Sequence, residues 1–219
     1  MALSIDDRSR SPVVVASIDD GKANALDLAT IVGIHEVVGD LGDHQALVLT
    51  GRDGMFSGGL DLGVLAAGGQ AADELLATMG RLLVAMLRSR RPIVVAADGH
   101  AVAAGAMLML AADHAVVTDR PANYGFAEVP NGMSLPTGVV ELIAERAAPT
   151  AALRLAAHGH LAGPVEAVEL GLADRVVAVD DLIDVSVEVA AGLASLPVVA
   201  YAETKRRVTR RLVERMTAT

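Results

Sequence analysis

The chain has 219 residues, of which 53% are hydrophobic and 21% are charged. This length is enough for one domain with a substantial buried core. The sequence contains no cysteine, which excludes disulfides, thiolate metal ligands and a cysteine nucleophile. The net charge of −9 argues against a nucleic-acid partner, because phosphate backbones attract basic surfaces.

Aromatic residues make up only 2% of the chain, so the core is expected to consist of small aliphatic side chains. Such a core is typical of layered α/β structure. The N-terminal segment MALSIDDRSRSP is polar and lacks the apolar stretch of a signal peptide. No apolar run approaches the ~18 residues of a membrane span. We therefore expect a cytoplasmic protein with no membrane partner.

The first half of the chain alternates between strand and helix patterns. Strands are predicted at 12–18, 46–50, 92–97 and 115–118. The helix between the first two strands presents Leu28, Ile31, Val32 and Val38 as its apolar face, with Asn24 or Asp27 as N-cap. A longer helix after Gly69 has apolar positions 75, 76, 79, 82, 83, 86 and 87, and Arg88, Arg90 and Arg91 are predicted to complement the dipole at its C-terminal end. Another helix is expected at 105–112.

After Pro136 the chain is predicted to be mostly helical. Helices are expected at 137–146, 150–157 and 164–170, a strand at 175–179, and helices on both sides of Pro197. The alternation in the first half requires crossover connections between parallel strands, which is typical of α/β proteins.

Three loops follow predicted strands, at 22–27, 56–62 and 98–106, and such loops usually carry the ligands of α/β folds. Gly58 and Gly59 let the backbone approach a ligand and point amide groups at it, although glycine pairs also serve simply as turns. The third loop opens into an apolar helix, whose first amides can face a negatively charged oxygen.

Five segments in order, KANALD, FSGGLDL, DGHAVAAGAM, YGFAEVPNGMSLP and LAGPVEAVELGLADRVV, resemble the signatures of the crotonase family, the enoyl-CoA hydratases and isomerases. The resemblance runs from about Val13 to Lys205. It implies an α/β fold, a crotonase-like spiral of repeated β-β-α units with a helical C-terminal region that is shortened at the C-terminus. It also implies an acyl-coenzyme A thioester as substrate, a place in fatty acid metabolism, and no permanently bound cofactor or metal.

By the same resemblance, the backbone N–H groups of Leu60 and Ala104 form an oxyanion hole for the thioester oxygen. Coenzyme A and the acyl group are expected to contact the neighbouring loops, largely through backbone atoms. The expected contact residues are Lys22, Ala23, Ala25, Leu26, Gly59, Asp61, Leu62, Gly105 and Met107.

The family's hydratases use two glutamates, and this sequence matches only one of them. The first position is Met107, which cannot transfer a proton, and the second is Glu128. A single base beside an oxyanion hole is enough to move a double bond from the 3 to the 2 position of an enoyl thioester. We therefore predict an isomerase in which apolar neighbours, such as Phe126, Val129 and Met107, raise the pKa of Glu128.

Several alternatives stay open from the sequence. Hydratase activity despite Met107 is one, and a non-catalytic acyl-CoA-binding protein is another. A remote third is a hydrolase with Ser57 or Ser134 as nucleophile, although neither lies in a Gly-x-Ser-x-Gly motif. Glu128 itself has an ordinary interpretation as a solvated loop carboxylate.

Other polar residues are interpreted as structural. His158 and His160 have no third metal ligand nearby in the sequence and are expected on the surface. His100 is expected to form part of the wall of the oxyanion loop. Asp61 is expected to organise its loop, and Asp113 to cap the helix before it.

The C-terminal segment is basic, with Lys205, Arg206, Arg207, Arg210, Arg211 and Arg215. It suits a solvated face, an acidic neighbouring subunit or the phosphates of coenzyme A. We expect a crotonase-like acyl-CoA-binding core at 1–196 and a short C-terminal helix at 197–219. The family resemblance further implies a homotrimer or a dimer of trimers.

Overall fold

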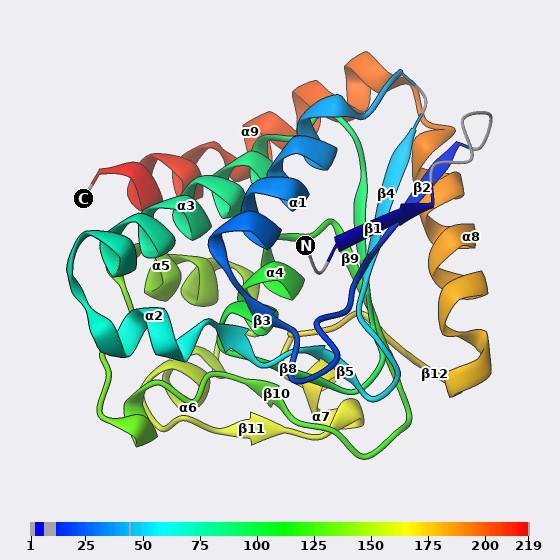
Figure 1. Cartoon of the computed structure of the whole chain (residues 1–219). Coiled ribbons are helices and arrows are strands. Elements are labelled where there is room, and N and C mark those ends of the chain that lie inside the picture. The colour runs from blue at the N-terminus through cyan, green and yellow to red at the C-terminus, as the bar shows by residue number, and fades with distance from the viewer. Residues whose placement is uncertain (1–2, 7–11, 44, 219) are drawn as a thin grey trace.

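The computed structural model describes residues 3–6, 12–43 and 45–218, and it has the α/β architecture that the sequence predicts. A main sheet stands between helices, with a smaller layer of short strands at one end (Figure 1). The parts of the N-terminal segment at 1–2 and 7–11 lie outside the described residues.

The main sheet has the strand order β1-β2-β4-β7-β9-β12. Its strands are β1 (Leu3–Asp6), β2 (Val13–Ile18), β4 (Ala46–Thr50), β7 (Ile93–Ala97), β9 (His114–Thr118) and β12 (Arg175–Val177). Only the β1–β2 pair is antiparallel, and the other neighbours are parallel. Every residue of β4 and β7 is buried, as expected for parallel strands covered on both faces.

Helices cover the two faces of this sheet unequally. One face carries α8 (Leu182–Ala194) alone, and the other carries α1 (Leu28–Asp40), α3 (Gly69–Arg88) and α4 (Ala104–Ala111) (Figure 1). The larger hydrophobic core lies on the second side and includes every residue of α4 except Gly105. This explains why α4 is apolar all round.

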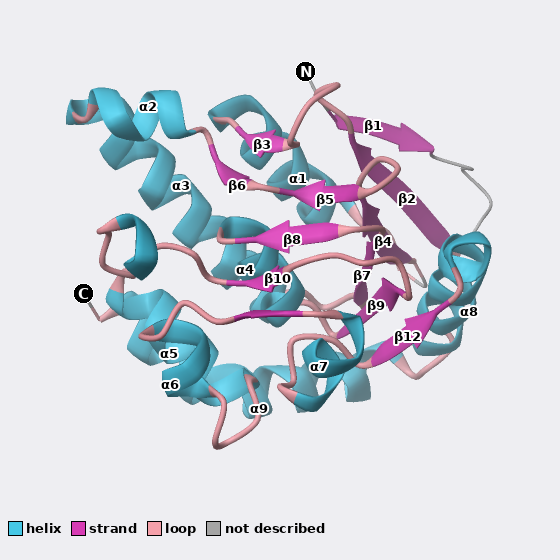
Figure 2. Cartoon of the chain, turned by 90° about the horizontal axis from the view of Figure 1, so that it is seen from below, coloured by secondary structure: helices cyan, strands magenta, loops and turns pink. Residues whose placement is uncertain are grey.

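A second layer contains short strands that the sequence did not reveal. It has the order β11-β10-β8-β5, with the pair β3-β6 beside it (Figure 2). Its strands are β3 (Ala25–Leu26), β5 (Met55–Ser57), β6 (Gly59–Leu60), β8 (His100–Val102), β10 (Tyr124–Gly125) and β11 (Leu161–Ala162). With two or three residues each, these strands are too short to show periodicity.

Four of the remaining helices follow the predictions closely: α5 (Thr137–Arg146), α6 (Ala152–Ala156), α7 (Pro164–Glu169) and α9 (Val198–Thr217). The short helix α2 (Leu62–Ala67) and the single turns η1 (Val129–Asn131) and η2 (Val179–Asp181) were not predicted. The helix α9 packs against α3 and α5. The division of the chain at residue 196 stays a prediction.

Two details of the predicted helices were wrong. In α1 the side chains of Ile31 and Val38 are buried as predicted, but Leu28 and Val32 are exposed, and Ile34 is buried in addition. The helix α3 ends at Arg88, so Arg90 and Arg91 lie beyond it. Arg91 instead pairs with Asp43, and its Nε donates to the carbonyl of Gly42 at 2.7 Å.

Among the described residues, no single helix has both the length and the apolar composition to span a membrane. One pair of segments meets the criteria together, Val179–Ala194 with Val198–Thr217, but it is bent by 102°.

Candidate active site

Strand pairing brings the three predicted loops to one place. The strands β5 and β8 pair in parallel, with Ser57 opposite Ala101. The strands β3 and β6 also pair in parallel, with Leu26 opposite Leu60. The loops 22–27, 56–62 and 98–106 therefore lie side by side, although the 70 residues at 28–97 separate the first from the third in the sequence (Figure 2).

Asn24 fixes the first of these loops onto the second. It is fully buried, and its Nδ2 donates to the carbonyls of Ile18 at 2.7 Å, Met55 at 3.0 Å and Phe56 at 3.2 Å. Its own carbonyl accepts from the Ser57 hydroxyl at 2.8 Å. The N-cap of α1 is Asp27, which accepts from Thr30 N at 2.7 Å. Asn24 thus holds the first loop to the second by hydrogen bonds and is not an N-cap.

Close backbone contacts place β6 against the start of α4. Gly59 has φ +113°, and a Cβ added there would lie 3.0 Å from the Cβ of Ala103 and 3.7 Å from the amide nitrogen of Ala104. A Cβ at Gly105 would lie only 2.6 Å from the carbonyl oxygen of Ser57. Only glycine fits at these two positions, and the contacts bring Leu60 and Ala104 together.

Ala103 adopts an unusual conformation just before α4. Its φ of 54° and ψ of −118° are rare for a residue with a side chain. In the described residues, the only other non-glycine residue with positive φ is Asn24. Both lie in the loops described above, and strained residues of this kind cluster at functional sites.

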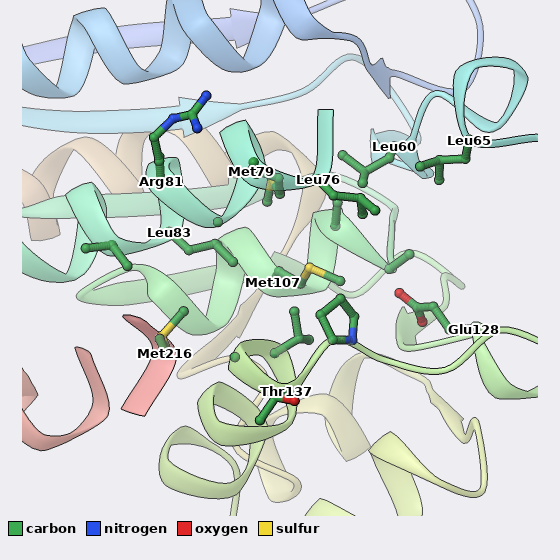
Figure 3. A pocket seen from close by; sticks show the side chains of 18 of the residues that line it. Leu60, Leu65, Leu76, Met79, Arg81, Leu83, Met107, Glu128, Thr137 and Met216 are labelled. Atoms are coloured by element: carbon green, nitrogen blue, oxygen red, sulfur yellow. The ribbon is translucent and has the colours of Figure 1, made fainter. Parts of the chain in front are cut away.

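A cavity of about 1080 Å³ opens beside these loops. Its lining includes Leu60, Ala104 and Glu128, which the sequence had placed in one site, and also Met107 and Leu62. Figure 3 shows the Glu128 carboxylate pointing toward the side of the cavity where Met107 lies. The predicted contact residues Lys22, Ala23, Ala25, Leu26, Gly59, Asp61 and Gly105 do not line this cavity.

Glu128 is the N-cap residue just before the η1 turn, and it is half-buried rather than solvated. Its Oε2 atom is buried and has no hydrogen-bond partner among the described residues. Burial raises the pKa of Glu128 above its ordinary value, because the charged form loses solvation. Of the expected neighbours, Phe126 is buried and Met107 lines the cavity, while Val129 is 43% exposed.

Of the three residues interpreted as structural, one behaves as expected. Asp61 is the N-cap of α2, accepting from Gly63 N at 2.8 Å and Val64 N at 3.2 Å. The prediction that Asp113 caps the preceding helix was wrong: the C-cap of α4 is Ala112, and the Asp113 carboxylate instead accepts from Ile93 N at 2.9 Å and from Lys205 Nζ at 2.6 Å. His100 does not line the cavity, so its assignment to the wall of the site was wrong. Its Nδ1 accepts from Asn123 N at 3.1 Å.

The serine alternatives receive no support from the geometry. Ser57 is fully buried, and its Oγ is committed between the carbonyl of Asn24 and the amide of Gly59. Ser134 lines the cavity, but the only histidine in that lining is His35, which is exposed. No described Ser–His hydrogen bond is present that would activate a nucleophile.

The basic C-terminal helix mostly forms ion pairs within the chain. Lys205 pairs with Asp113, and Arg206 and Arg207 approach Glu203 at 3.0 and 3.5 Å. Arg215 bridges Glu141 and Glu145 on α5, at 2.6 Å each. These charges therefore mainly form ion pairs within α9 and between α9 and the residues packed against it.

His158 and His160 lie between α6 and α7, away from the cavity lining. His160 Nε2 lies 2.9 Å from Glu166 Oε1, which also accepts from Arg154 at 2.8 Å. Within the described residues there is no cluster of three or more His, Cys, Asp or Glu side chains suited to a metal ion.

Part of the cavity lining was not anticipated. Helix α3 contributes Leu76, Met79 and Leu83, and α9 contributes Met216 and Thr217. In the sequence, the α3 residues are part of an ordinary apolar helix face. The one local signal is Leu76, which belongs to the apolar stripe and yet is 43% exposed, beside the cavity.

Comparison with known proteins identifies the relatives of this chain. The family model for enoyl-CoA hydratase/isomerase matches residues 8–219. A carnitinyl-CoA dehydratase from Proteus mirabilis is 30% identical over 210 residues, which cover 94% of this chain and 80% of that protein.

Solved structures agree in fold across almost the whole chain. An enoyl-CoA hydratase/isomerase family protein from Pseudomonas syringae is 31% identical, with a TM-score of 0.92, covering 99% of this chain and 93% of that chain. An enoyl-CoA isomerase from Mycobacterium tuberculosis is 29% identical, with a TM-score of 0.91, covering 99% and 95%. The predicted crotonase-type fold is thereby confirmed.

Proposed function

Because the chain belongs to the enoyl-CoA hydratase/isomerase family, we propose that it moves the double bond of a 3-enoyl-CoA to the 2 position, using one glutamate base. The observation that carries this proposal is the composition of the cavity. Among its described lining residues, Glu128 is the only carboxylate, and it shares the lining with Leu60 and Ala104.

The N–H groups of Leu60 and Ala104 are the proposed oxyanion hole for the thioester oxygen. Ala104 is the first residue of α4, so its N–H has no partner within the helix and the positive end of the helix dipole lies behind it. The contacts of Gly59 and Gly105 fix this amide relative to β6. Donors held in place before the reaction stabilise the developing negative charge without reorganisation.

Glu128 then performs both proton transfers in this proposal. Its carboxylate removes a proton from C2, the electrons of that C–H bond form the enolate, and the negative charge resides on the thioester oxygen. The same carboxyl returns the proton to C4, which leaves the double bond between C2 and C3. A raised pKa suits this role, because the protonated form must be stable enough to give the proton back.

Hydration would need a second acid/base group, and Met107 cannot supply it. The other ionisable side chains of the described lining, His35, Arg81 and Arg88, are all exposed. In Figure 3, Arg81 lies far from Glu128 and its guanidinium points away from Met107. This arrangement favours isomerisation over hydration.

We extend the proposal to the coenzyme. The loops at 22–26 and 59–62 would contact its pantetheine and adenine, as the family resemblance implies, while the acyl chain enters the cavity. The protein would act in the cytoplasm, in fatty acid metabolism, as a homotrimer or a dimer of trimers. Light scattering of the purified protein measures the assembly directly.

The test is a panel of substrates. Purified protein is incubated with trans-3-enoyl and trans-2-enoyl thioesters of coenzyme A, and both the formation of the conjugated thioester and its loss by hydration are followed. Conjugation without hydration is the expected result. Hydration at a comparable rate would show a hydratase, and tight binding without either reaction would show an acyl-CoA-binding protein; either outcome overturns the proposal.

A further inference from the structure

The cavity continues well beyond Glu128. It runs between α3 and α5 and reaches the last turn of α9, where Met216 and Thr217 line it. Figure 3 shows Met216 on the opposite side of Met107 from Glu128. The volume of about 1080 Å³ is slightly above the usual range for small-molecule pockets, ~300–1,000 Å³. The space is larger than a short acyl group needs.

Methionine is concentrated in this lining. Four of the eight methionines in the sequence line the cavity, and they come from four different segments of the chain. They are Met79 of α3, Met107 of α4, Met133 after η1 and Met216 of α9. We call this set the methionine lining. The walls of the cavity are therefore richer in methionine than the rest of the core.

Methionine differs from the other apolar residues in its flexibility. It is unbranched, has three rotatable side-chain bonds and carries a polarisable sulfur, so it fills irregular spaces and adapts to different partners. Leucine has a similar volume but fewer accessible shapes. A cavity lined by methionine therefore suits ligands of varied shape.

The backbone at the far wall is nevertheless held firmly. Arg215, next to Met216, donates through Nε to Glu141 and through Nη2 to Glu145, each at 2.6 Å. A Cβ added at Gly138 would lie 3.4 Å from the carbonyl oxygen of Met216, so α5 and α9 are in direct contact there. Adaptation at this wall is thus confined to the Met216 side chain.

We propose that the methionine lining determines the acyl specificity of this protein, allowing one site to bind uncharged acyl chains of different length and shape. The inference rests on the proposed function of the site, because it assigns the cavity to the acyl chain. The lining residues act by contact with the chain and take no part in proton transfer.

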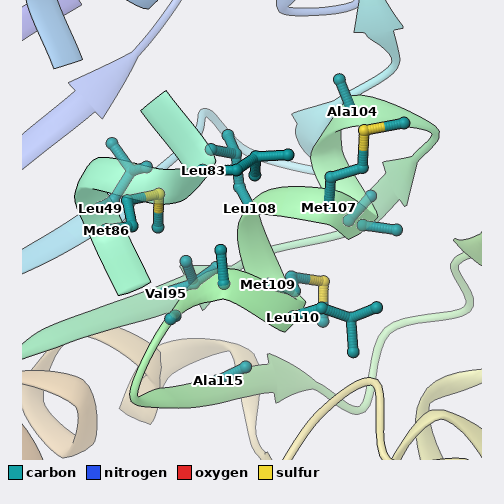
Figure 4. Packing of buried hydrophobic residues seen from close by; sticks show 14 of the residues in the cluster. Leu49, Leu83, Met86, Val95, Ala104, Met107, Leu108, Met109, Leu110 and Ala115 are labelled. Atoms are coloured by element: carbon teal, nitrogen blue, oxygen red, sulfur yellow. The ribbon is translucent and has the colours of Figure 1, made fainter. Parts of the chain in front are cut away.

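The test compares two matched sets of substitutions. In the lining variant, Met79, Met107, Met133 and Met216 are replaced by leucine. In the control, Met86 and Met109 are replaced by leucine; both are buried in the core around α4 and neither lines the cavity (Figure 4). Binding of saturated acyl thioesters and of thioesters with a remote cis double bond is measured by calorimetry. If the fourfold variant does not fold, the Met216→Leu variant is used alone.

In the unchanged protein, affinity is expected to rise about fourfold per added methylene until the cavity is filled. Straight and bent chains should bind within about threefold of each other, and the lining variant should separate them by at least about fivefold, because leucine adapts less. The control should keep the ratio of the unchanged protein. An unaltered ratio in the lining variant, or an affinity independent of chain length, would overturn the proposal. Saturated thioesters bind without reacting, so failure of the isomerase proposal would leave this measurement interpretable.

Discussion

The two ends of the cavity are built in opposite ways. At the end near Leu60 and Ala104, the backbone is fixed by the Asn24 amide and by glycine contacts that leave no room for a side chain. At the other end, flexible apolar side chains such as Met79 and Met216 form the wall. The backbone at the first end has one fixed arrangement, whereas the side chains at the second end can adopt several.

This difference follows from what each end has to do. Stabilising a developing charge requires donors at a fixed position, and a displacement of about 1 Å can cost roughly 100-fold in rate. Holding an aliphatic chain requires only that apolar surface be removed from water, which has no preferred direction. The two described non-glycine residues with positive φ, Asn24 and Ala103, both lie at the end near Leu60 and Ala104.

Removing the base should have the largest effect. The Glu128→Gln variant keeps the shape of the side chain, but its amide cannot take the proton from C2 of the substrate. The rate of isomerisation is therefore expected to fall by about 10²- to 10⁴-fold. The rate of formation of the conjugated thioester measures this directly. Calorimetric binding of a saturated acyl-CoA should stay unchanged.

The stability of the same variant provides a check on burial. Because the folded pKa of Glu128 is raised, its unfolded form loses the proton first, and the stability of the fold declines as pH rises through the folded pKa. Glu128→Gln removes this titration, so its denaturation midpoint at neutral pH should equal or exceed that of the unchanged protein. A clear loss of stability would indicate a structural role for Glu128.

Displacing the fixed end should come next. In Gly59→Ala the new Cβ would lie 3.0 Å from Ala103 on a backbone of φ +113°, so β6 must move away from α4. Turnover is expected to fall by about 100-fold, since the two amides separate. The matched control is Gly39→Ala, where nothing lies within 4 Å of the new Cβ. Equal turnover in the two variants would show that the position of β6 does not affect catalysis.

Much of this architecture was visible in the sequence. The long helices and buried strands were predicted because their apolar periodicity extends over many residues, and Glu128, Leu60 and Ala104 were placed by motif order. The short strands β3, β6, β8 and β10 were not found, since two or three residues carry no period. The role of Asn24 was missed because its partners lie up to 32 residues away.

Removing the hydrogen bonds of the Asn24 side chain should lower the stability of the fold. Asn24→Ala leaves three carbonyls without their donor and places at φ 50° an alanine, which adopts positive φ less readily than asparagine, so the free energy of unfolding should fall by about 2 kcal/mol. Asn24→Gly loses the same bonds but tolerates the backbone, and should lose less. Chemical denaturation separates the two. Equal losses would mean that the backbone conformation carries no strain.

Relieving the strain before α4 should have the smallest effect, and in the opposite direction. Ala103→Gly removes the Cβ at φ 54°, so the free energy of unfolding should rise by about 1 kcal/mol. The greater freedom of glycine in the unfolded chain offsets part of this gain. Thermal denaturation measures the change, and a lower midpoint would show that the backbone strain at Ala103 costs less than the added freedom of glycine in the unfolded chain.

The pH dependence of isomerisation tests most directly whether the half-buried carboxylate of Glu128 performs the reaction. The ratio kcat/KM for a 3-enoyl-CoA is measured from acid to neutral pH in the unchanged protein and in Glu128→Gln. It should rise through a single pKa above the ordinary glutamate value of about 4.3, because the base works only when deprotonated. The residual activity of Glu128→Gln should lack this step. A step that persists in that variant, or a flat profile in the unchanged protein, would contradict the assignment of Glu128 as the base.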